Sequence, residues 1–171
     1  MTKSRIVFSI LILLANVSWS NAQDSVKVSA RDFKALIGSW QGALTYLDYQ
    51  SGKPYTMPAN LKVYRIGKSN NYVLSNIYPN EKSANSTDTL KIASDGRSIG
   101  TERIISKRKL ENGDLEIVTG KSGTDGNDNK PALFRYTYTI GRSVYKKKKE
   151  VQFSGETTWV KRHEYIYQIH E

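Results

Sequence analysis

The chain has 171 residues and a formal net charge of +10 at pH 7, from 26 Lys and Arg against 16 Asp and Glu, and it contains no cysteine. The lack of cysteine excludes disulfide bonds, thiolate catalysis, cysteine-ligated metal sites and a lipid-modified N-terminal cysteine. A basic balance can indicate a nucleic acid, an anionic membrane or an acidic ligand as partner. Because the charges are spread over several segments, we interpret them as a basic and soluble surface.

Residues 1–22 have the three-part pattern of a secretory signal peptide. Lys3 and Arg5 form a basic start, an apolar run covers residues 6–17, and small residues follow. The run is too short to span a bilayer as a permanent helix, although a retained anchor is the alternative. We therefore expect cleavage after Ala22 and export to the periplasm or the medium, with no integral membrane segment left after cleavage.

Residues 23–171 are expected to form one domain. The leader carries two of the 26 basic residues and none of the 16 acidic ones, so the mature chain has a net charge of +8. About 150 residues can bury roughly two-thirds of the surface of the unfolded chain, which is enough for one hydrophobic core. No repeat or linker divides this segment, and we expect a monomer.

A short helix is predicted at the start of the mature domain. Ser29 can cap it, and Asp32 lies three residues later, where a capping box needs an acidic residue. Three apolar residues have the i, i+3, i+4 spacing of one helix face: Phe33, Leu36 and Ile37. Gly38 is a natural stop. At only two turns, this helix is expected to plug another structure.

Almost everything after Gly38 has the alternation of β-strands. Nine strand candidates are predicted: residues 40–46, 61–64, 71–78, 87–93, 98–106, 115–119, 133–140, 143–153 and 157–169. Turn signals such as Asp95-Gly96 and Asn112-Gly113 separate them. The predicted fold class is all-β, an antiparallel up-and-down β-barrel of about eight or nine strands with a short N-terminal helix.

The segment 120–131 consists almost entirely of turn-forming residues. Asp125, Asn127 and Asn129 imitate the first half of a calcium-binding loop, but Lys130 stands where that loop needs glycine. We therefore predict a mobile hairpin loop here and no metal site.

Gly38 and Trp40 follow the predicted helix at the start of the first strand. In that position they resemble the G-x-W signature of the calycin superfamily, which contains the lipocalins and the fatty-acid-binding proteins. The resemblance covers residues 33–49 and 159–167 and is greatest to small, exported, lipocalin-like domains of bacteria. It implies that the tryptophan closes the barrel floor and that an arginine of the last strand, best matched by Arg162, packs across the indole ring. The resemblance also implies that Gly38, Trp40 and Arg162 hold the fold and bind no ligand.

Alternate residues of a barrel strand face inward. With Trp40 inside, one face of its strand and one face each of strands 71–78 and 133–140 can be assigned to the interior. Six inward residues are predicted to bind a ligand: Tyr46, Asp48, Tyr72, Phe134, Tyr136 and Tyr138. The eleven tyrosines suit a pocket for an amphipathic or aromatic ligand. The alternative is a dry barrel that these rings fill.

Residues 146–149 are four consecutive lysines, so one pair shares a face with Tyr145 and Val151. A buried lysine would need an anionic partner, such as a ligand carboxylate or Asp48. The simpler interpretation places the lysines in solvent, where they guard a strand edge.

No catalytic residue, metal site or cofactor is predicted. The histidines are His163 and His170, and no G-x-S-x-G elbow accompanies them. The expected function is non-covalent binding of a small hydrophobic or amphipathic ligand, with an anionic ligand as one option. The alternatives are an envelope protein-interaction module with a filled barrel and a basic outer surface, and a haem-binding calycin that uses His163. Nucleic acid is not expected, because the aromatic residues do not interleave with the basic ones.

Overall fold

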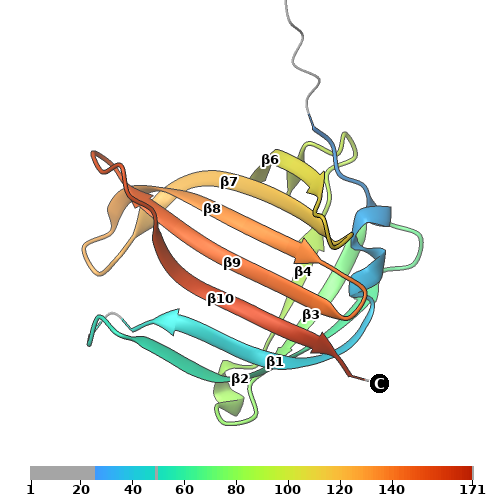
Figure 1. Ribbon diagram of the computed structural model, residues 1–171, viewed down its shortest axis with the longest axis horizontal. Helices are drawn as coiled ribbons and strands as arrows, with labels where there is room; N and C mark the ends of the chain where they lie inside the picture. The colour runs from blue at the N-terminus through green and yellow to red at the C-terminus, as the bar shows by residue number, and fades with distance from the viewer. Residues whose placement is uncertain (1–25, 49, 171) are drawn as a thin grey trace, which may run out of the picture.

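One antiparallel sheet curls into a nearly closed barrel (Figure 1). Side chains along its strands point alternately into the barrel and outward. The computed structural model describes residues 26–48 and 50–170. The predicted signal peptide, residues 1–22, lies outside the described residues, so its cleavage and the export of the protein stay predictions. Within the described residues, no helix is long and apolar enough to cross a membrane.

Ten strands make up the sheet. In chain order they are β1 (Gly38–Leu47), β2 (Pro54–Arg65), β3 (Asn71–Ile77), β4 (Ser86–Lys91), β5 (Ser98–Ile99), β6 (Glu102–Lys109), β7 (Leu115–Asp125), β8 (Lys130–Ile140), β9 (Val144–Phe153) and β10 (Val160–Ile169). A single turn of 3-10 helix, η2 (Lys82–Ala84), precedes β4. The sheet order is β4-β3-β2-β1-β10-β9-β8-β7-β6-β5, so β1 pairs with β10. An isolated bridge between Ile92 and Ile99 joins the two edges, and the barrel has its seam there.

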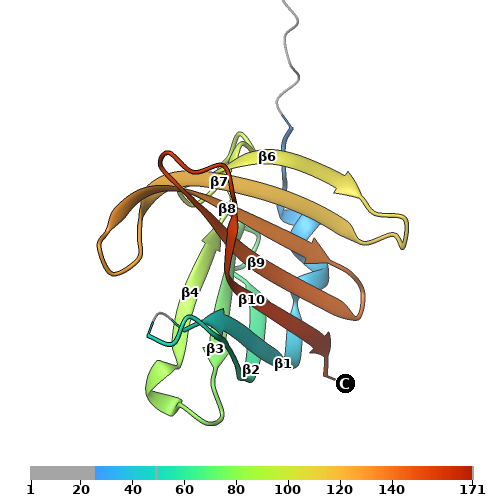
Figure 2. The same ribbon diagram turned by 60° about the vertical axis from the view of Figure 1, so that its left-hand side comes forward.

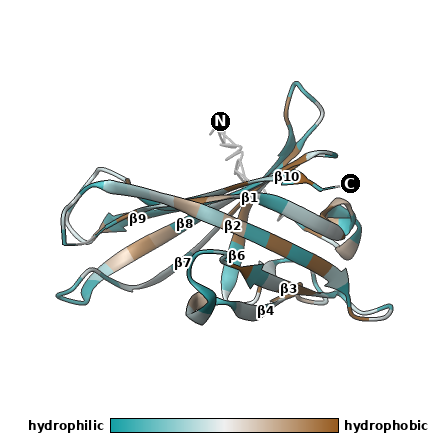
Figure 3. Cartoon of the chain, turned by 90° about the horizontal axis from the view of Figure 1, so that it is seen from below, coloured by the Kyte–Doolittle hydropathy of each residue, from teal (hydrophilic) through white to brown (hydrophobic). Residues whose placement is uncertain are grey.

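The predicted all-β up-and-down fold is confirmed, with ten strands instead of eight or nine. The additional strand arises because the predicted strand 98–106 divides at Gly100, whose φ of 55° lies in the left-handed region that favours glycine. Along β2, buried and exposed residues alternate over its second half, and Figure 3 shows the matching alternation of hydropathy. This pattern sets which face of the sheet forms the core.

The segment 120–131 does form a hairpin, but the predicted long loop is wrong, because only residues 126–129 form the turn and the others are strand. β7 continues to Asp125, and β8 begins at Lys130. Gly123, which has the composition of a loop residue, lies in β7, where an added Cβ would come 2.5 Å from the ring of Phe134. A glycine required by close packing in a strand therefore has the same sequence signal as a glycine required by a turn.

The N-terminal helix, η1 (Ala30–Leu36), is a 3-10 helix that packs at one end of the barrel (Figure 1). Phe33 and Leu36 are completely buried, as predicted, but Ile37 is 44% exposed. The helix ends at Leu36, and Ile37 is its C-cap residue with an extended backbone, so Ile37 does not continue the helix face. The prediction that this helix plugs another structure is confirmed, and the prediction that Ile37 belongs to its apolar face is wrong.

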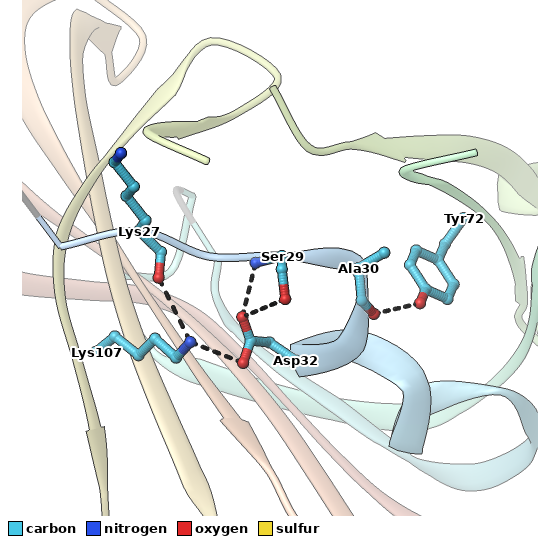
Figure 4. Close-up of polar contacts among 6 residues, drawn as sticks. All are labelled: Lys27, Ser29, Ala30, Asp32, Tyr72 and Lys107. Atoms are coloured by element: carbon cyan, nitrogen blue, oxygen red, sulfur yellow. Dashed lines mark hydrogen bonds and ion pairs between the residues drawn. The ribbon is translucent and has the colours of Figure 1, made fainter. Parts of the chain in front are cut away.

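Polar contacts within its own first turn and from two strands, β3 and β6, hold η1 in place (Figure 4). The carboxylate of Asp32 accepts hydrogen bonds from the backbone N–H of Ser29 at 2.7 Å and from its hydroxyl at 3.2 Å. The same carboxylate forms an ion pair with Lys107 of β6 at 2.7 Å. Tyr72 of β3 donates a hydrogen bond of 2.5 Å to the carbonyl of Ala30. The capping interaction predicted between Ser29 and Asp32 is therefore confirmed.

Trp40 of β1 is 1% exposed and lies against the plug. Its indole Nε1 donates a hydrogen bond of 2.8 Å to the carbonyl of Leu36. Its ring meets Tyr145 of β9 edge-on at 6.3 Å between centroids. The signature tryptophan is thus a core residue at the closed end of the barrel.

The prediction that Arg162 packs across Trp40 is wrong. The β1–β10 register pairs Trp40 with Ile169 and pairs Tyr46 with His163, so Arg162 lies near the opposite end of β10. Its Nε bonds Asp125 at 2.6 Å. A register shift between Lys161 and His163, which a sequence pattern does not display, moves this part of β10.

An arginine–tryptophan stack does exist elsewhere in the barrel. The guanidinium of Arg135, on β8, lies 4.2 Å from the ring centroid of Trp159. A guanidinium therefore does stack on an indole ring in this barrel, but the pair is Arg135 and Trp159 and not Arg162 and Trp40.

Candidate functional site

A cavity of about 390 Å3 lies inside the barrel, between the seam and the opposite wall. Strands β8, β9 and β10 supply one wall, and β3 and β4 face it from the other side of the barrel (Figure 2). Residues 99–102, which run from β5 into β6, line the cavity at the seam. The interior is therefore not filled by side chains, as a dry barrel would be.

Three tyrosines form a stacked row in the cavity wall. Tyr145 of β9 and Tyr167 of β10, which are paired in register, have centroids 5.8 Å apart and planes inclined by 12°. Tyr165 continues the row at 5.7 Å and 13°. Its hydroxyl shares a hydrogen bond of 2.8 Å with Tyr78 across the barrel. Burial raises the pKa of Tyr165 and of Tyr167, so both rings stay neutral.

Glu102 of β6 lines the cavity beside the seam, and its carboxylate already has partners. Its Oε2 accepts hydrogen bonds from the Thr119 hydroxyl at 2.6 Å and from the Tyr138 hydroxyl at 2.8 Å. Burial, followed by the nearby charge of Glu102, raises the pKa of Tyr138 well above its usual value. Tyr138 therefore remains a hydrogen-bond donor to this carboxylate.

Lys147 of β9 projects into the same cavity. Its Nζ lies 5.4 Å from the ring centroid of Tyr138 and 5.8 Å from that of Tyr136. It makes no hydrogen bond or ion pair with any residue that the structure describes. Burial lowers the pKa of Lys147, while the charges of Glu102 and Asp88 oppose that shift.

The interpretation of the lysine run as a guarded strand edge is wrong, because β9 lies between β8 and β10. The run alternates as predicted. Lys148 pairs with Glu150 at 3.2 Å, whereas Lys149, on the face of Lys147, pairs with Asp125 at 3.3 Å. An unpaired lysine in the interior is thus a feature of Lys147 and not of the whole run.

His163 of β10 also lines the cavity. Burial, together with the charges of Lys147 and Lys149, lowers the pKa of His163 to about 4. The imidazole is therefore neutral at pH 7. It contacts Tyr165 edge-on at 5.6 Å between ring centroids.

The hydroxyl of Tyr145 is fully buried and has no hydrogen-bond partner among the described residues. Burial is the main cause that raises the pKa of Tyr145, so the phenol keeps its proton. An unpaired buried donor is uncommon in folded proteins and calls for an explanation.

Two of the six predicted ligand-binding residues, Tyr136 and Tyr138, line the cavity. Their binding role stays a prediction. The other four lie elsewhere, and Tyr72 donates to the plug as described above. Tyr46 packs against Tyr55 at 5.6 Å, and Phe134 lies under the ammonium of Lys149 at 4.4 Å.

Asp48 does not face the cavity and is not the partner of Lys147. Its carboxylate accepts hydrogen bonds from the Ser51 hydroxyl at 2.7 Å and from the Gln50 N–H at 3.0 Å. The Ser51 hydroxyl, followed by the Gln50 N–H, lowers the pKa of Asp48. This residue shapes the β1–β2 turn.

A second, shallow groove lies on the surface beside η1. Its cations include Lys107, which pairs with Asp32, and Arg108, which pairs with Glu116 at 2.7 Å. The other three cations of its lining, Arg31, Lys109 and Arg142, form no ion pair with the described residues. Within residues 26–48 and 50–170, no three His, Asp or Glu side chains are close enough to hold a metal ion.

The architecture is a nearly closed, ten-stranded, antiparallel up-and-down barrel. No family model matches the chain, and no curated protein matches it. The chain is similar in structure to Rv2717c from M. tuberculosis, with 14% identity and a TM-score of 0.49, over 85% of this chain and 100% of that one. It is also similar to a DUF3598 protein of unknown function from Nostoc punctiforme, with 15% identity and a TM-score of 0.44, over 84% of this chain and 50% of that one. These likenesses concern the fold alone.

Proposed function

We propose that the protein, once exported, binds a small amphipathic molecule non-covalently inside the barrel. One observation carries the proposal: a cavity of about 390 Å3, with an aromatic wall and a few polar groups, lies among residues of eight strands. This volume lies within the range of roughly 300–1,000 Å3 that is usual for ligand pockets. The proposal of export rests on residues 1–22.

The stacked row of Tyr145, Tyr167 and Tyr165 supports burial of the apolar part of such a ligand. Removal of apolar surface from water supplies about 25 cal/mol per Å2, so a small ligand can gain several kcal/mol against this wall. Hydroxyl and charged groups at the seam and on β9 would fix its orientation.

Binding of a neutral fluorescent probe, N-phenyl-1-naphthylamine, tests the proposal. Leu74 of β3 lines the cavity, and Leu74→Trp would fill part of it. Ile77→Trp is the matched control, because Ile77 lies on the same strand and is exposed. The probe should bind the wild type and the control and should bind Leu74→Trp at least tenfold more weakly. Equal binding to both variants would contradict the proposal.

Haem binding through His163 is a second candidate, and one observation favours it. His163 lines the cavity and is neutral at pH 7, which is the form that ligates iron. Titration with haem should then give a Soret band shift that His163→Ala abolishes. A shift that survives in His163→Ala, or the absence of a shift, would exclude this candidate.

The third candidate, an interaction module with a filled barrel, is disfavoured. Its premise is that side chains fill the interior, and the cavity occupies that space.

A further inference from the structure

Lys147 of β9 places an amine in the cavity wall without a counter-ion. Its Nζ makes no hydrogen bond or ion pair with the residues that the structure describes. A charge in a protein interior is costly unless it is paired, so burial favours the neutral amine over the ammonium. The neutral amine is a nucleophile, and a lysine desolvated in this way is a common means of activating one.

The two carboxylates that line the same cavity are engaged by other groups. Glu102 accepts two hydrogen bonds from side chains of β7 and β8, as described above, and Asp88 accepts one of 3.0 Å from Asn76. Burial lowers the pKa of Lys147 although Glu102 and Asp88 oppose the shift, and the charge of Lys121 on β7 adds to it. The carboxylates therefore weaken the effect of burial on this amine without cancelling it.

The other lysines of the run 146–149 differ from Lys147 in position or in pairing. Lys146 is exposed on the outer face of β9. Lys148 and Lys149 each form an ion pair with a carboxylate, at 3.2 and 3.3 Å. Lys147 thus combines an interior position with the lack of an ion pair among the described residues.

Tyr145 supplies a hydrogen-bond donor on the same face of β9. It stands two residues before Lys147, and both residues line the cavity. Its buried hydroxyl has no acceptor among the described residues. The carbonyl oxygen of a bound molecule would be such an acceptor, and the stacked rings of Tyr165 and Tyr167 would contact its apolar part.

We infer that Lys147 captures amphipathic aldehydes in the cavity by forming a reversible imine with them. The Lys147 nitrogen is the nucleophile, and the Tyr145 hydroxyl donates a hydrogen bond to the carbonyl oxygen. The inference rests on the proposed function, because the aldehyde must first bind in the same cavity, and it adds a covalent step to that function.

The covalent step needs no oxidant or reductant. The neutral nitrogen of Lys147 attacks the carbonyl carbon, and a proton passes from nitrogen to oxygen to give a carbinolamine. The hydroxyl of the carbinolamine takes up a proton and leaves as water while the nitrogen lone pair forms the C=N bond. Loss of the remaining N–H proton then gives the neutral imine and returns the proton that was taken up. Water reverses the reaction, so the aldehyde stays releasable.

Reductive trapping with 1-naphthaldehyde tests the inference. The aldehyde is added at pH 7 in less than stoichiometric amount, and sodium cyanoborohydride converts any imine to a stable secondary amine. Peptide mapping by mass spectrometry then locates the label. Lys147 should carry about tenfold more label than any other lysine of the chain.

Two pairs of variants separate the amine from the cavity. Lys147→Met should lose the dominant label and still bind N-phenyl-1-naphthylamine, whereas Lys146→Met, the matched control, should keep both. Leu74→Trp, which fills part of the cavity, should lose most of the label at Lys147, and Ile77→Trp should keep it.

If the neutral probe binds but the label is spread evenly over the lysines, the inference is overturned while the proposed function stands. Label that persists at Lys147 in Leu74→Trp would also overturn it, because the reaction would not depend on the cavity. If the probe fails to bind, the proposed function fails, and the inference fails with it. Far-ultraviolet circular dichroism shows that each variant is folded.

Discussion

The plugged end of the barrel and the cavity wall satisfy their polar groups in different ways. At the plug, Asp32 meets Ser29 and Lys107, and the Tyr72 hydroxyl meets the carbonyl of Ala30. At the cavity wall, the hydroxyl of Tyr145 and the ammonium of Lys147 have no acceptor within the described residues. The polar groups of the plug are satisfied within the chain, whereas two donors of the cavity wall are not satisfied by the described residues.

The largest expected difference between the two regions concerns packing. Phe33 is completely buried in the plug, so Phe33→Ala should lower the free energy of unfolding by about 3–5 kcal/mol. Leu74 borders the existing cavity and has fewer neighbours to lose, so Leu74→Ala should cost about 2 kcal/mol. Urea unfolding of both variants measures these values. Equal losses would remove the contrast in packing.

A second prediction concerns how the free energy of unfolding decreases at acidic pH. The pKa of His163 is lowered to about 4, below the unfolded value of 6.5, so the unfolded chain binds more protons between these values. Stability attributable to His163 should therefore be present above pH 6.5 and be lost as the pH falls toward 4, by an amount on the order of 2 kcal/mol.

The measurement is the pH dependence of urea midpoints in His163→Phe, with His170→Phe as control because His170 is exposed. His163→Phe should show a shallower loss between pH 6.5 and 4 than either the control or the wild type. An unchanged slope would show that His163 is not held neutral by the cavity wall.

A smaller difference in stability is expected between phenylalanine variants of two buried tyrosines, Tyr72 and Tyr145. Tyr72→Phe removes a hydrogen bond and leaves the carbonyl of Ala30 without its donor, so it should cost about 1–2 kcal/mol. Tyr145→Phe removes a hydroxyl that has no partner among the described residues, so it should change stability by less than about 1 kcal/mol or increase it. Thermal unfolding monitored by circular dichroism compares the two. A loss in Tyr145→Phe as large as in Tyr72→Phe would mean that the Tyr145 hydroxyl is satisfied in the free protein.

The sequence predicted the features that depend on alternation and local capping. Strand alternation correctly places Tyr136 and Tyr138 inside the barrel, and the Ser29–Asp32 spacing predicts the start of η1. Both follow from contacts between residues close in sequence or from the period of two along a strand.

The predictions that were wrong concern features that depend on how strands lie relative to one another. Lys147 could be assigned to the interior only once β9 was known to lie between two other strands. Arg162 was misplaced because the distance of a residue from Trp40 depends on the β1–β10 register and on the irregularity beside His163. Gly123 was misread because a glycine under Phe134 and a glycine in a turn have the same sequence signal.

Native mass spectrometry of the protein purified from its own host tests the central claim most directly. The wild type and Ile77→Trp should each carry a small molecule that is released on gentle activation, and Leu74→Trp should carry none. Fragmentation should identify the released molecule as a small amphipathic compound. A wild-type protein that carries no small molecule, or a molecule retained equally by Leu74→Trp, would contradict the claim that the barrel cavity is a ligand-binding site.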